Sequence, residues 1–583
     1  MSVEKPSRYT GGEFNQIVKD HAKMKASFAF CFPDTYEVGM SHVGMRILYH
    51  ILNKREDTVC ERVFAPWLDM EDLMRQKGQP LFSLETQKNV KEFDIVGFTL
   101  QYEMSYTNII NMLDLADIPI RSKDRSDSDP IIMAGGPCAS NPETLADIMD
   151  LFVIGEGEEV TLELIDLYIS VKDMSGTKKE FLERASKIEG VYVPVLYNSK
   201  TNIKRRIIKD LDSVSYPVDP IVPYINIVHD RISLEIFRGC IRGCRFCQAG
   251  YIYRPVREKS PEKLIEQAKH MIASTGYEEM GLVSLSTSDY SRLPSLCDGL
   301  LEQTQDKMVN LSVPSLRIDN FSIGLMEKLQ KVRKSGLTFA PEAGSQRLRD
   351  VINKNITEED ILRSVTMARD GGYNNIKLYF MLGLPTETDE DVIAIADLSK
   401  KIIEAFDRKR KVNVTVSTAF FIPKPFTAFQ WCAQITREEM ARKQKLLKEH
   451  ITDRKITYNW HEFDTSVVEG IISRGDKKVG EAIIKAWEKG CKFDSWSQCF
   501  DMRKWERAFM ESGVDVSYYT SREISVDELL PWDHIDIGVK KSFLVSEYEK
   551  ASMGKTTPNC REKCSNCGIK KYKCGVCVEN NKD

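Results

Sequence analysis

Three cysteines stand close together near the middle of the chain, in the stretch Cys240-Ile-Arg-Gly-Cys244-Arg-Phe-Cys247. Thiolates at this spacing can bind three irons of a cubane iron–sulfur cluster. The fourth iron then has no protein ligand and can bind a substrate or cofactor, just as a catalytic zinc keeps one position open. Zinc is the alternative metal, but a closed zinc site needs a fourth ligand, and the neighbouring sequence offers no further His or Cys.

A second group of cysteines lies at the end of the chain. Cys560, Cys564 and Cys567 repeat the C-x3-C-x2-C spacing, and Cys574 and Cys577 follow. The stretch is too polar for these five cysteines to be explained as buried apolar residues. Two interpretations stay open: a second [4Fe–4S] cluster with one spare cysteine, or a zinc site, for which the pairs are closely spaced.

The composition limits the class of protein. The chain has 583 residues, of which 42% are hydrophobic and 29% charged, and this predicts three or four folded domains. The net charge of −4 excludes a globally basic nucleic-acid binder but not a local basic patch. Because long apolar stretches and an export signal are lacking, we expect no membrane span and a cytoplasmic protein. The scattered cysteines are then expected to be reduced and buried.

The elements that must position the cysteines begin with short apolar runs separated by helical patterns such as Gly44–Leu52. The predicted strands are Ala26–Phe32, Asp94–Leu100, Ile131–Ala134 and Leu151–Ile154. This alternation predicts an α/β fold, with a doubly wound parallel sheet over residues 1–170. Ligands of such sheets bind at the carboxyl ends of the strands.

A second βα series occupies residues 229–434 and carries the central cysteines after its first strand. Its predicted strands are Ile232–Phe237, Gly281–Leu285, Val309–Val313, Leu337–Ala340, Asn375–Met381 and Val412–Thr418. Helical patterns separate them, for example Pro261–Ala273 and Asp389–Ala405. A complete barrel needs eight βα units, so these six predict a partial (βα)6 barrel that is open on one side.

Three further regions complete the predicted organisation. Residues 171–228 connect the two βα series and are less periodic. Residues 435–549 are helical in pattern. Residues 550–583 form the cysteine-rich tail, whose eight Lys and Arg outnumber three Asp and Glu. This excess can offset the charge of thiolates or contact RNA phosphates.

At the central cysteines the sequence resembles the radical S-adenosylmethionine (radical SAM) superfamily. The cysteine spacing, the aromatic Phe246 before the last cysteine and the place after the first barrel strand all match. The resemblance implies a [4Fe–4S] cluster on Cys240, Cys244 and Cys247, whose open iron chelates S-adenosylmethionine (SAM). It further implies reductive cleavage of SAM to a 5′-deoxyadenosyl radical, with an electron donor such as flavodoxin or ferredoxin.

The same resemblance implies further SAM contacts beside Phe246. Ser286 and Ser288 follow the second strand, Arg317 the third and Glu342 the fourth, and Lys377 lies on the fifth. Many members carry a glycine-rich turn after the second strand. This chain has Ser286-Thr287-Ser288 there instead, so backbone or hydroxyl contacts would have to replace it. Capping or packing roles for these residues stay open.

The N-terminal region resembles the cobalamin-binding domains that precede some radical SAM barrels. Two turns after predicted strands match those domains, one with Gly135 and Gly136 and the other with Gly155.

The expected cobalt ligand is missing from this region. Many such domains carry D-x-H-x-x-G after the first strand, whereas here Asp34 and Gly39 stand but Tyr36 replaces the His. His42 lies further on and would have to fold back. Two interpretations stay open: cobalamin bound without a protein axial ligand, or a domain that has lost cobalamin and serves recognition.

The whole layout resembles a group of uncharacterised bacterial radical SAM proteins with a cobalamin-like domain and a cysteine-rich tail. The matching stretches are Pro33–His42, Ile422–Thr427, Ser473–Asp476 and Pro531–His534. The barrel is also similar to methylthiotransferases of tRNA and ribosomal protein. These resemblances predict methyl or sulfur transfer to a bulky or macromolecular substrate, with RNA or a ribosomal component as a possible partner. A non-catalytic iron–sulfur scaffold or redox sensor is the alternative.

Overall fold

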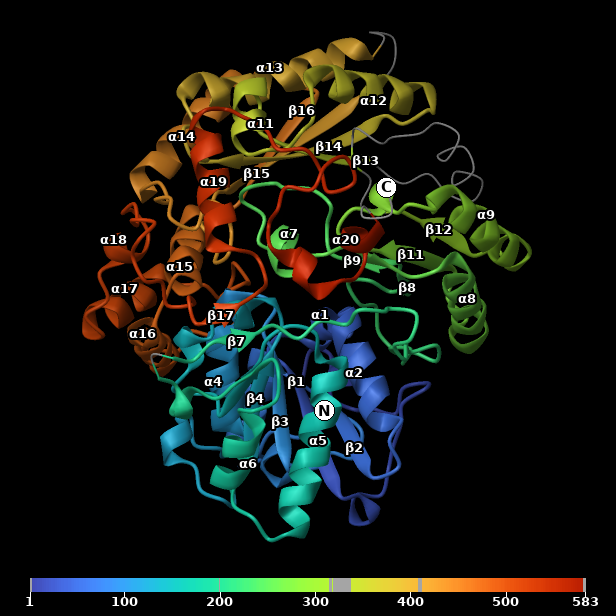
Figure 1. Ribbon diagram of the computed structural model, residues 1–583, viewed down its shortest axis with the longest axis vertical. Coiled ribbons are helices and arrows are strands. Elements are labelled where there is room, and N and C mark those ends of the chain that lie inside the picture. The colour runs from blue at the N-terminus through green and yellow to red at the C-terminus, as the bar shows by residue number, and fades with distance from the viewer. Residues whose placement is uncertain (1–2, 199, 314–316, 318–336, 407–411, 580–583) are drawn as a thin grey trace.

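The computed structural model describes residues 3–198, 200–313, 317, 337–406 and 412–579 (Figure 1). The N-terminal βα domain forms one end of the molecule and the barrel strands the other. The C-terminal segment returns between these two parts and crosses the barrel, ending near its first strands. The predicted α/β class and the order of a doubly wound domain before a barrel are confirmed.

The N-terminal sheet has the strand order β2-β1-β3-β4-β5-β6, with the first five strands parallel and β6 antiparallel to β5. Its strands are β1 (Ala26–Phe32), β2 (Thr58–Phe64), β3 (Ile95–Thr99), β4 (Ile131–Gly135), β5 (Leu151–Val153) and β6 (Val191–Tyr192). The order reverses between β1 and β3, which makes the carboxyl ends of these strands the expected ligand position.

The two faces of this sheet pack against different helices. Alternate residues such as Ala29 and Cys31 join the core formed with α3 (Leu68–Lys77) and α4 (Tyr106–Leu115). Their neighbours join a second core with α2 (Val43–Asn53) and α5 (Gly157–Asp173). The predicted doubly wound arrangement is therefore present, because side chains alternate between the faces of a strand.

Strand β2 was not predicted, since two charges stand in its middle. Glu61 and Arg62 are nonetheless buried. Arg62 donates to Glu85 at 2.6 Å and to Glu13 at 2.9 Å, and Glu61 accepts from Thr86. Internal partners thus replace water around these charges, which a local apolar pattern does not reveal. Strand β6 lies in the predicted connecting region and extends the sheet into it.

The barrel strands form two parallel sheets, ordered β12-β11-β8 and β13-β14-β15-β16. They are β8 (Ile232–Glu235), β11 (Glu279–Val283), β12 (Asn310–Ser312), β13 (Leu337–Glu342), β14 (Asn375–Leu382), β15 (Asn413–Phe420) and β16 (Ile456–Trp460). All six predicted strands are present. Residues 435–549 are mainly helical, as their pattern predicts, but they also contain β16, a short run of β-branched and aromatic residues that pairs with β15.

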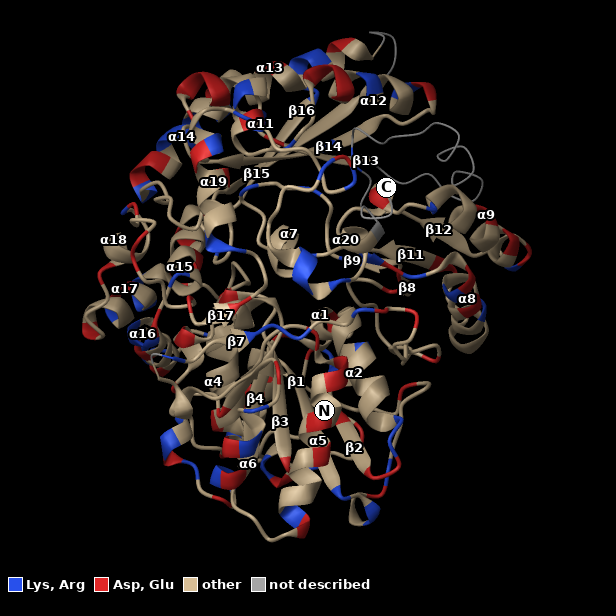
Figure 2. Cartoon of the chain, in the orientation of Figure 1, with Lys and Arg blue, Asp and Glu red and all other residues tan. Residues whose placement is uncertain are grey.

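Helices cover the outside of the barrel strands. Helix α8 (Pro261–Thr275) begins where predicted, because the Ser260 side chain accepts from the backbone N–H of Lys263 and Pro261 occupies the first turn. Helix α13 (Asp389–Ala405) has the predicted bounds. Charged residues of both signs are spread over the outer helices, while the strands carry few (Figure 2).

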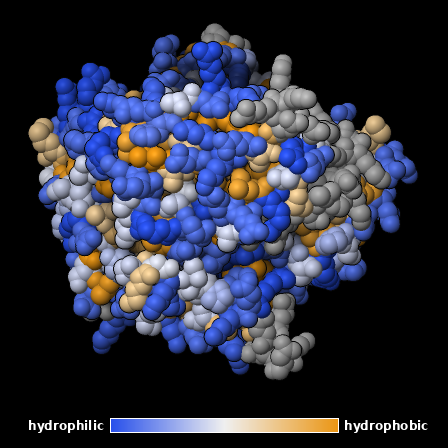
Figure 3. All heavy atoms as spheres, turned by 90° about the horizontal axis from the view of Figure 1, so that it is seen from above, coloured by the Kyte–Doolittle hydropathy of each residue, from blue (hydrophilic) through white to orange (hydrophobic). Residues whose placement is uncertain are grey.

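The C-terminal region packs along the side of both domains. Its longer helices are α14 (Arg437–His450), α15 (Phe463–Ser473), α16 (Lys477–Glu488), α17 (Met502–Glu511) and α19 (Lys541–Ser552). Strand β17 (Ile535–Asp536) pairs in parallel with β7 (Ile203–Lys204), so the region is tied to the interdomain connection. Seen from the barrel end, the surface is largely hydrophilic with small apolar areas (Figure 3). None of the helices in the described ranges has the length and apolar character that crossing a membrane requires.

Candidate active site

The three central cysteines lie in the loop between β9 (Phe237–Arg238) and α7 (Ala249–Ile252). Burial raises the pKa of Cys240 to about 12 and that of Cys247 to about 11, and the nearby Cys244 raises both further. The three thiols are therefore close neighbours. Among the described residues, no three His, Cys, Asp or Glu side chains are placed so that they could hold one metal ion. A cubane differs from such a site, since each of its cysteines binds a separate iron.

A buried arginine fixes this loop to distant parts of the chain. Arg245 is fully buried and donates from Nε and Nη2 to Glu547 of α19, at 3.2 and 3.1 Å. It also donates to the carbonyl of Val351, at the end of α11 (Gln346–Val351), at 2.8 Å. Gly239, just before Cys240, has φ +89°, and a Cβ there would lie 2.5 Å from the carbonyl oxygen of Pro255. These contacts therefore constrain the backbone path of the loop.

The serines after the second barrel strand face the cysteine loop. Ser286 is 3% exposed and donates to Asp289 at 2.7 Å, and Asp289 forms an ion pair with Arg242 at 2.6 Å. Ser288 accepts from the backbone N–H of Arg317 at 3.1 Å. The structure thus brings the predicted residues Ser286, Ser288 and Arg317 to the cysteine loop, while their role toward SAM stays a prediction.

Glu342 ends strand β13 beside the cysteine loop. Its φ of +69° is rare for a residue with a side chain, and the β13 register shifts between Phe339 and Glu342. The carboxylate accepts from Lys354 at 3.1 Å, and both side chains influence the pKa of Cys247. Backbone strain of this kind is found at functional sites. The arrangement supports the predicted cofactor contact by Glu342.

Lys354 is a site residue that the sequence analysis missed. Its carbonyl accepts from Arg317 Nη2 at 3.1 Å, and its ammonium group pairs with Glu342. Lys354 therefore links two predicted contacts that come from different strands. It lies in an irregular stretch after α11, and no spacing in the sequence marks it.

Two predicted contacts take other positions. Phe246 packs in an apolar cluster with Ala343 and Leu384, behind Glu342. Lys377 projects from β14, with its Nζ 4.6 Å from the ring centre of Tyr379. The alternating burial along β14 places both on the partly exposed face of the sheet. For Lys377 the structure gives a contact with Tyr379 of its own strand.

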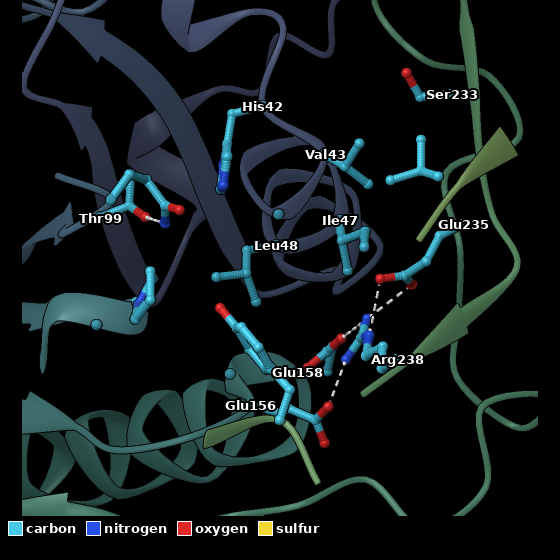
Figure 4. Close-up of a pocket in the computed structure, with 18 of the residues that line it drawn as sticks. His42, Val43, Ile47, Leu48, Thr99, Glu156, Glu158, Ser233, Glu235 and Arg238 are labelled. Carbon is cyan, nitrogen blue, oxygen red and sulfur yellow. Dashed lines mark hydrogen bonds and ion pairs between the residues drawn. The ribbon is translucent and has the colours of Figure 1, made fainter. Parts of the chain in front are cut away.

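A cavity of about 690 Å³ lies between the N-terminal sheet and the first barrel strands (Figure 4). Gly135, Gly136 and Gly155, at the carboxyl ends of β4 and β5, line it as expected. On the other side β8 and β11 line it, and the wall reaches Gly239, the residue before Cys240. The cavity thus joins the predicted ligand edge of one domain to the cysteine loop of the other.

The prediction that Asp34, Tyr36 and Gly39 form a ligand loop at this edge is wrong in position, because none of them lines the cavity. The Tyr36 side chain is buried and its hydroxyl donates to Glu13 at 2.9 Å. Asp34 accepts from Trp496 Nε1 at 3.0 Å. Gly39 lies against the Phe64 ring. The chain forms the short helix α1 (Tyr36–Gly39) here, which turns these side chains toward the core.

His42, with its neighbour Ser41, lines the cavity from the end of this segment (Figure 4). Its Nδ1 accepts from the backbone N–H of Met45 at 3.1 Å and caps α2. Burial lowers the pKa of His42 to about 4, so the ring is neutral at pH 7, and Gln101 forms a hydrogen bond with it. Because Nδ1 accepts, the proton of the neutral ring is on Nε2.

A buried charge network closes the cavity between the domains. Arg238 of the barrel forms ion pairs with Glu158 and Glu156 of the N-terminal domain, at 2.5 and 3.3 Å, and with Glu235 at 2.9 Å (Figure 4). Arg257 adds a pair with Glu156 at 2.6 Å. These contacts hold the N-terminal sheet against the first barrel strand. The sequence analysis assigned no role to any of these residues.

Comparison with known proteins identifies the family. Residues 44–194 match the family model described as radical SAM proteins, N-terminal, and residues 234–399 match that of the radical SAM superfamily. An uncharacterised protein of Methanocaldococcus jannaschii is 31% identical over 464 residues, which are 79% of this chain and 91% of the relative. The chain belongs to the radical SAM superfamily. The predicted resemblance to this superfamily is thereby confirmed, and the protein is a radical SAM enzyme.

Some more distant relatives of this radical SAM protein are described as enzymes that transfer groups. A putative methylthiotransferase of M. jannaschii is 23% identical over 52% of this chain and 64% of the relative. Among solved structures, TsrM of Kitasatospora setae with cobalamin and a [4Fe–4S] cluster has 14% identity and a TM-score of 0.48, covering 68% of this chain and 75% of its own. The cobalamin-dependent enzyme OxsB has 11% identity and a TM-score of 0.48, covering 91% and 79%.

Membership establishes the cofactors of the barrel, a [4Fe–4S] cluster and SAM. The residues present fit them, since three neighbouring thiols lie in one loop with Glu342, Lys354 and Arg317 beside it. Carboxylate, ammonium and guanidinium groups are suited to the amino and carboxylate groups of SAM.

Proposed function

We propose that this radical SAM enzyme transfers a methyl group to a bulky or macromolecular substrate and holds a corrinoid as methyl carrier in the interdomain cavity. The observation that carries the proposal is the cavity of about 690 Å³, which reaches from the carboxyl edge of the N-terminal sheet to Gly239, beside Cys240. Its volume lies within the range of about 300–1,000 Å³ that is typical of cofactor sites.

The cavity lining suits a large, flat ligand that carries amide groups. Apolar side chains form most of the N-terminal wall, among them Phe30, Leu48 and Met133. Thr99 and Gln101 add polar groups near His42. A mainly apolar wall with a few polar groups is the usual composition of a cofactor pocket.

The geometry of His42 supports a corrinoid without a nitrogen ligand from the protein. A histidine binds a metal through an unprotonated nitrogen. In the neutral ring Nε2 carries the proton, and Nδ1 is occupied by the Met45 N–H. Gln101 donates to Thr99 at 2.6 Å through its amide nitrogen, which leaves its oxygen to accept from His42. Coordination through His42 would break the cap of α2.

The residues of the chain have separable tasks in this reaction. When bound, one SAM would supply the methyl group, leaving S-adenosylhomocysteine, and a second SAM, cleaved with one electron from the cluster, would supply the 5′-deoxyadenosyl radical, leaving methionine. Glu342, Lys354 and Arg317 hold the polar end of SAM by charge. Arg238, paired with Glu156 and Glu158, keeps the N-terminal sheet over the cysteine loop and limits the entry of water. Such fixed positioning is the protein's main contribution in enzymes whose cofactor carries the chemistry.

The open face of the barrel sheet supports a bulky substrate. Parallel sheets usually bury both faces. Strand β14 instead alternates between buried and more exposed residues, and Tyr379 on its more exposed face is 38% exposed. Polar side chains such as Lys377 share this face. We propose it as the substrate surface, with RNA or a ribosomal component among the candidates.

The experiment is anaerobic reconstitution of the full chain with iron, sulfide, SAM and hydroxocobalamin. We expect Leu48→Trp, which fills the cavity, to weaken cobalamin binding at least tenfold without changing the iron content. Leu529→Trp is the matched control, because Leu529 is 84% exposed and far from the cavity lining. A wild-type chain that binds no cobalamin would contradict the corrinoid part, whereas absence of 5′-deoxyadenosine after reduction would contradict the radical activity itself.

The Co(II) form tests the ligand arrangement separately. We expect its electron paramagnetic resonance spectrum to show no nitrogen superhyperfine splitting from the protein, and His42→Ala to leave the spectrum unchanged. Splitting that disappears in His42→Ala would show that His42 binds cobalt after all.

A further inference from the structure

The five tail cysteines converge although they span a loop and two short helical turns. Cys577, in α20 (Val576–Glu579), is the centre of the group. Burial raises its pKa to about 12, and Cys567, Cys560, Cys564 and Cys574 each raise it further by their proximity. Cys567 is only 8% exposed. These thiols are therefore near enough to Cys577 to affect its charge, within a polar segment.

A buried cation faces this group of thiols. Arg254 is 3% exposed and donates from Nε to the carbonyl of Gly250 at 2.8 Å and from Nη2 to that of Arg242 at 3.0 Å. Cys567 accepts a hydrogen bond from it, and Cys560 lies near it. Among the described residues, its Nη1 has no hydrogen-bond partner. No ion pair with a carboxylate is formed by Arg254 within those residues.

A nearby anion would stabilise such a cation. Removing an ion from water costs several kcal/mol unless an opposite charge repays it. Neutral thiols do not carry that charge, whereas a metal–thiolate centre does. The position of Arg254 is thus independent support for a charged centre on the tail cysteines.

The tail is fixed directly behind the barrel's cysteine loop. The backbone N–H of Cys560 donates to the carbonyl of Ile241, the residue after Cys240, at 3.0 Å. Val576 donates in the same way to Val256 at 3.0 Å, beside β9 and α7 (Figure 1). Gly575 has φ +56°, and a Cβ there would lie 1.9 Å from the carbonyl oxygen of Val256. Only glycine permits this approach.

We infer that Cys560, Cys564, Cys567 and Cys577 hold a second [4Fe–4S] cluster, which passes electrons to the barrel cluster across the Cys560–Ile241 contact. Cys574 is the spare cysteine. It is 6% exposed, but the charged groups that most affect its pKa are Arg257, Glu156, Lys209 and Arg205 rather than the other thiols. Its side chain therefore lies toward the interdomain charge network.

The electrons balance with one external donor. A one-electron reductant of the flavodoxin or ferredoxin class reduces the tail cluster from the 2+ to the 1+ state. The tail cluster returns to 2+ as it reduces the barrel cluster to 1+, and that electron is consumed in cleaving one SAM. The inference rests on the barrel cluster of the superfamily and not on methyl transfer or cobalamin.

Metal analysis of matched cysteine variants tests the site. After anaerobic reconstitution we expect ~8 iron per wild-type chain and ~4 in Cys567→Ser, because one cubane is lost. Cys574→Ser, at an equally buried position, should keep ~8, since cubane ligation needs four cysteines. Zinc in place of half the iron would overturn the cluster. Equal iron loss in both variants would overturn the ligand assignment. Cobalamin binding should be unchanged in each variant, which separates this result from a failure of the proposed function.

Electron transfer is tested with rapid-freeze paramagnetic resonance. We expect reduced flavodoxin to reduce the barrel cluster at least tenfold more slowly in Cys567→Ser than in wild type. We also expect Arg254→Gln to make the tail cluster harder to reduce, and Arg254→Lys, which keeps the charge, to change its potential less. An unchanged reduction rate in Cys567→Ser would overturn the relay. An unchanged potential in both arginine variants would overturn the role of Arg254.

Discussion

The barrel loop and the tail share the C-x3-C-x2-C spacing, yet their surroundings differ. In the barrel loop, Glu342, Lys354 and Arg317 lie beside the three cysteines and leave polar groups for a small molecule. In the tail, Cys577 lies among the other thiols and Arg254 faces them from the protein interior. One arrangement offers polar groups on an open side, and the other adds a further cysteine and a buried cation to its thiols.

The same cysteine spacing thus occurs in two different surroundings. The neighbouring side chains, rather than the spacing, decide what a cluster at each position could do. Polar groups beside an open iron favour binding and chemistry, as at catalytic metal sites in general. A fully ligated cluster next to a buried cation can only accept and donate electrons. The barrel loop and the tail can be tested separately by mutation.

The largest effect is expected at the barrel loop. Replacing Cys240, Cys244 and Cys247 by alanine should abolish 5′-deoxyadenosine formation, because thiolates are the iron ligands of this loop. Product analysis after dithionite reduction measures it. Cys297→Ala, at a buried cysteine away from both groups, is the control and should retain the activity. Full activity in the triple variant would contradict the assignment of these three cysteines as iron ligands.

A smaller effect is expected at the open side of the barrel cluster. Glu342→Gln should weaken SAM binding by about 10- to 150-fold, because one charge-assisted hydrogen bond contributes roughly 1.5–3 kcal/mol. The dissociation constant of SAM from the reconstituted protein measures it. Glu359→Gln, at an exposed position of α12 (Glu358–Asp370), should bind SAM as wild type does. If both variants bind alike, Glu342 belongs to packing rather than to the cofactor site.

The buried contacts that hold the barrel loop in place are expected to contribute to the free energy of unfolding. Arg245→Ala removes the fully buried cation that pairs with Glu547, which keeps only the partly exposed Lys550 and the Thr557 hydroxyl as partners, and should lower the free energy of unfolding by about 3–5 kcal/mol. The half-exposed pair of Lys401 and Glu358 is the contrast, and Lys401→Ala should cost about 0–1 kcal/mol. Urea unfolding measures both. Similar losses would show that the buried pair does not fix the loop.

The smallest effect is expected in the pH dependence of stability. It concerns the contact between the N-terminal sheet and the C-terminal region that leads to the tail. Burial lowers the pKa of His534 to about 4, and the ring lies between Tyr192 and Tyr197. Glu143 is 3.5 Å away, but burial raises the pKa of that carboxyl, so the pair does not hold the imidazole charged.

The stabilising contribution of neutral His534 is complete above pH 6.5, where the unfolded chain also carries it neutral. It is lost as the pH falls from 6.5 toward 4. We expect about 2 kcal/mol less stability at pH 5 than at pH 7 from this residue. Unfolding at both pH values measures the loss, and His534→Gln should remove this part of it. A wild-type stability that does not change between these pH values would contradict the prediction.

Sequence patterns were sufficient where the physics is local. Strand β1 and helix α13 have their predicted bounds, because an uninterrupted apolar run and a capped amphipathic pattern need no distant partner. Cys240, Cys244 and Cys247 were found because one short loop carries the whole set. Strand β2 was missed, since Glu61 and Arg62 are neutralised by groups outside the strand.

The remaining site residues depend on contacts between distant segments. Glu547 meets Arg245 across 302 residues, and Arg254 meets Cys567 only after the tail has folded back. His42 was set aside because the position of α1 could not be foreseen from the sequence. The domain boundaries and the roles of the SAM contacts stay predictions.

The contact between Arg245 and Glu547 also has a consequence for synthesis. The 302 residues between them take roughly 15–60 s to translate at about 5–20 residues per second. During that time the barrel loop has been made but lacks its buried carboxylate and the tail behind it. Nascent chains therefore carry three unligated thiols that are open to oxidation, and iron is best delivered after release from the ribosome.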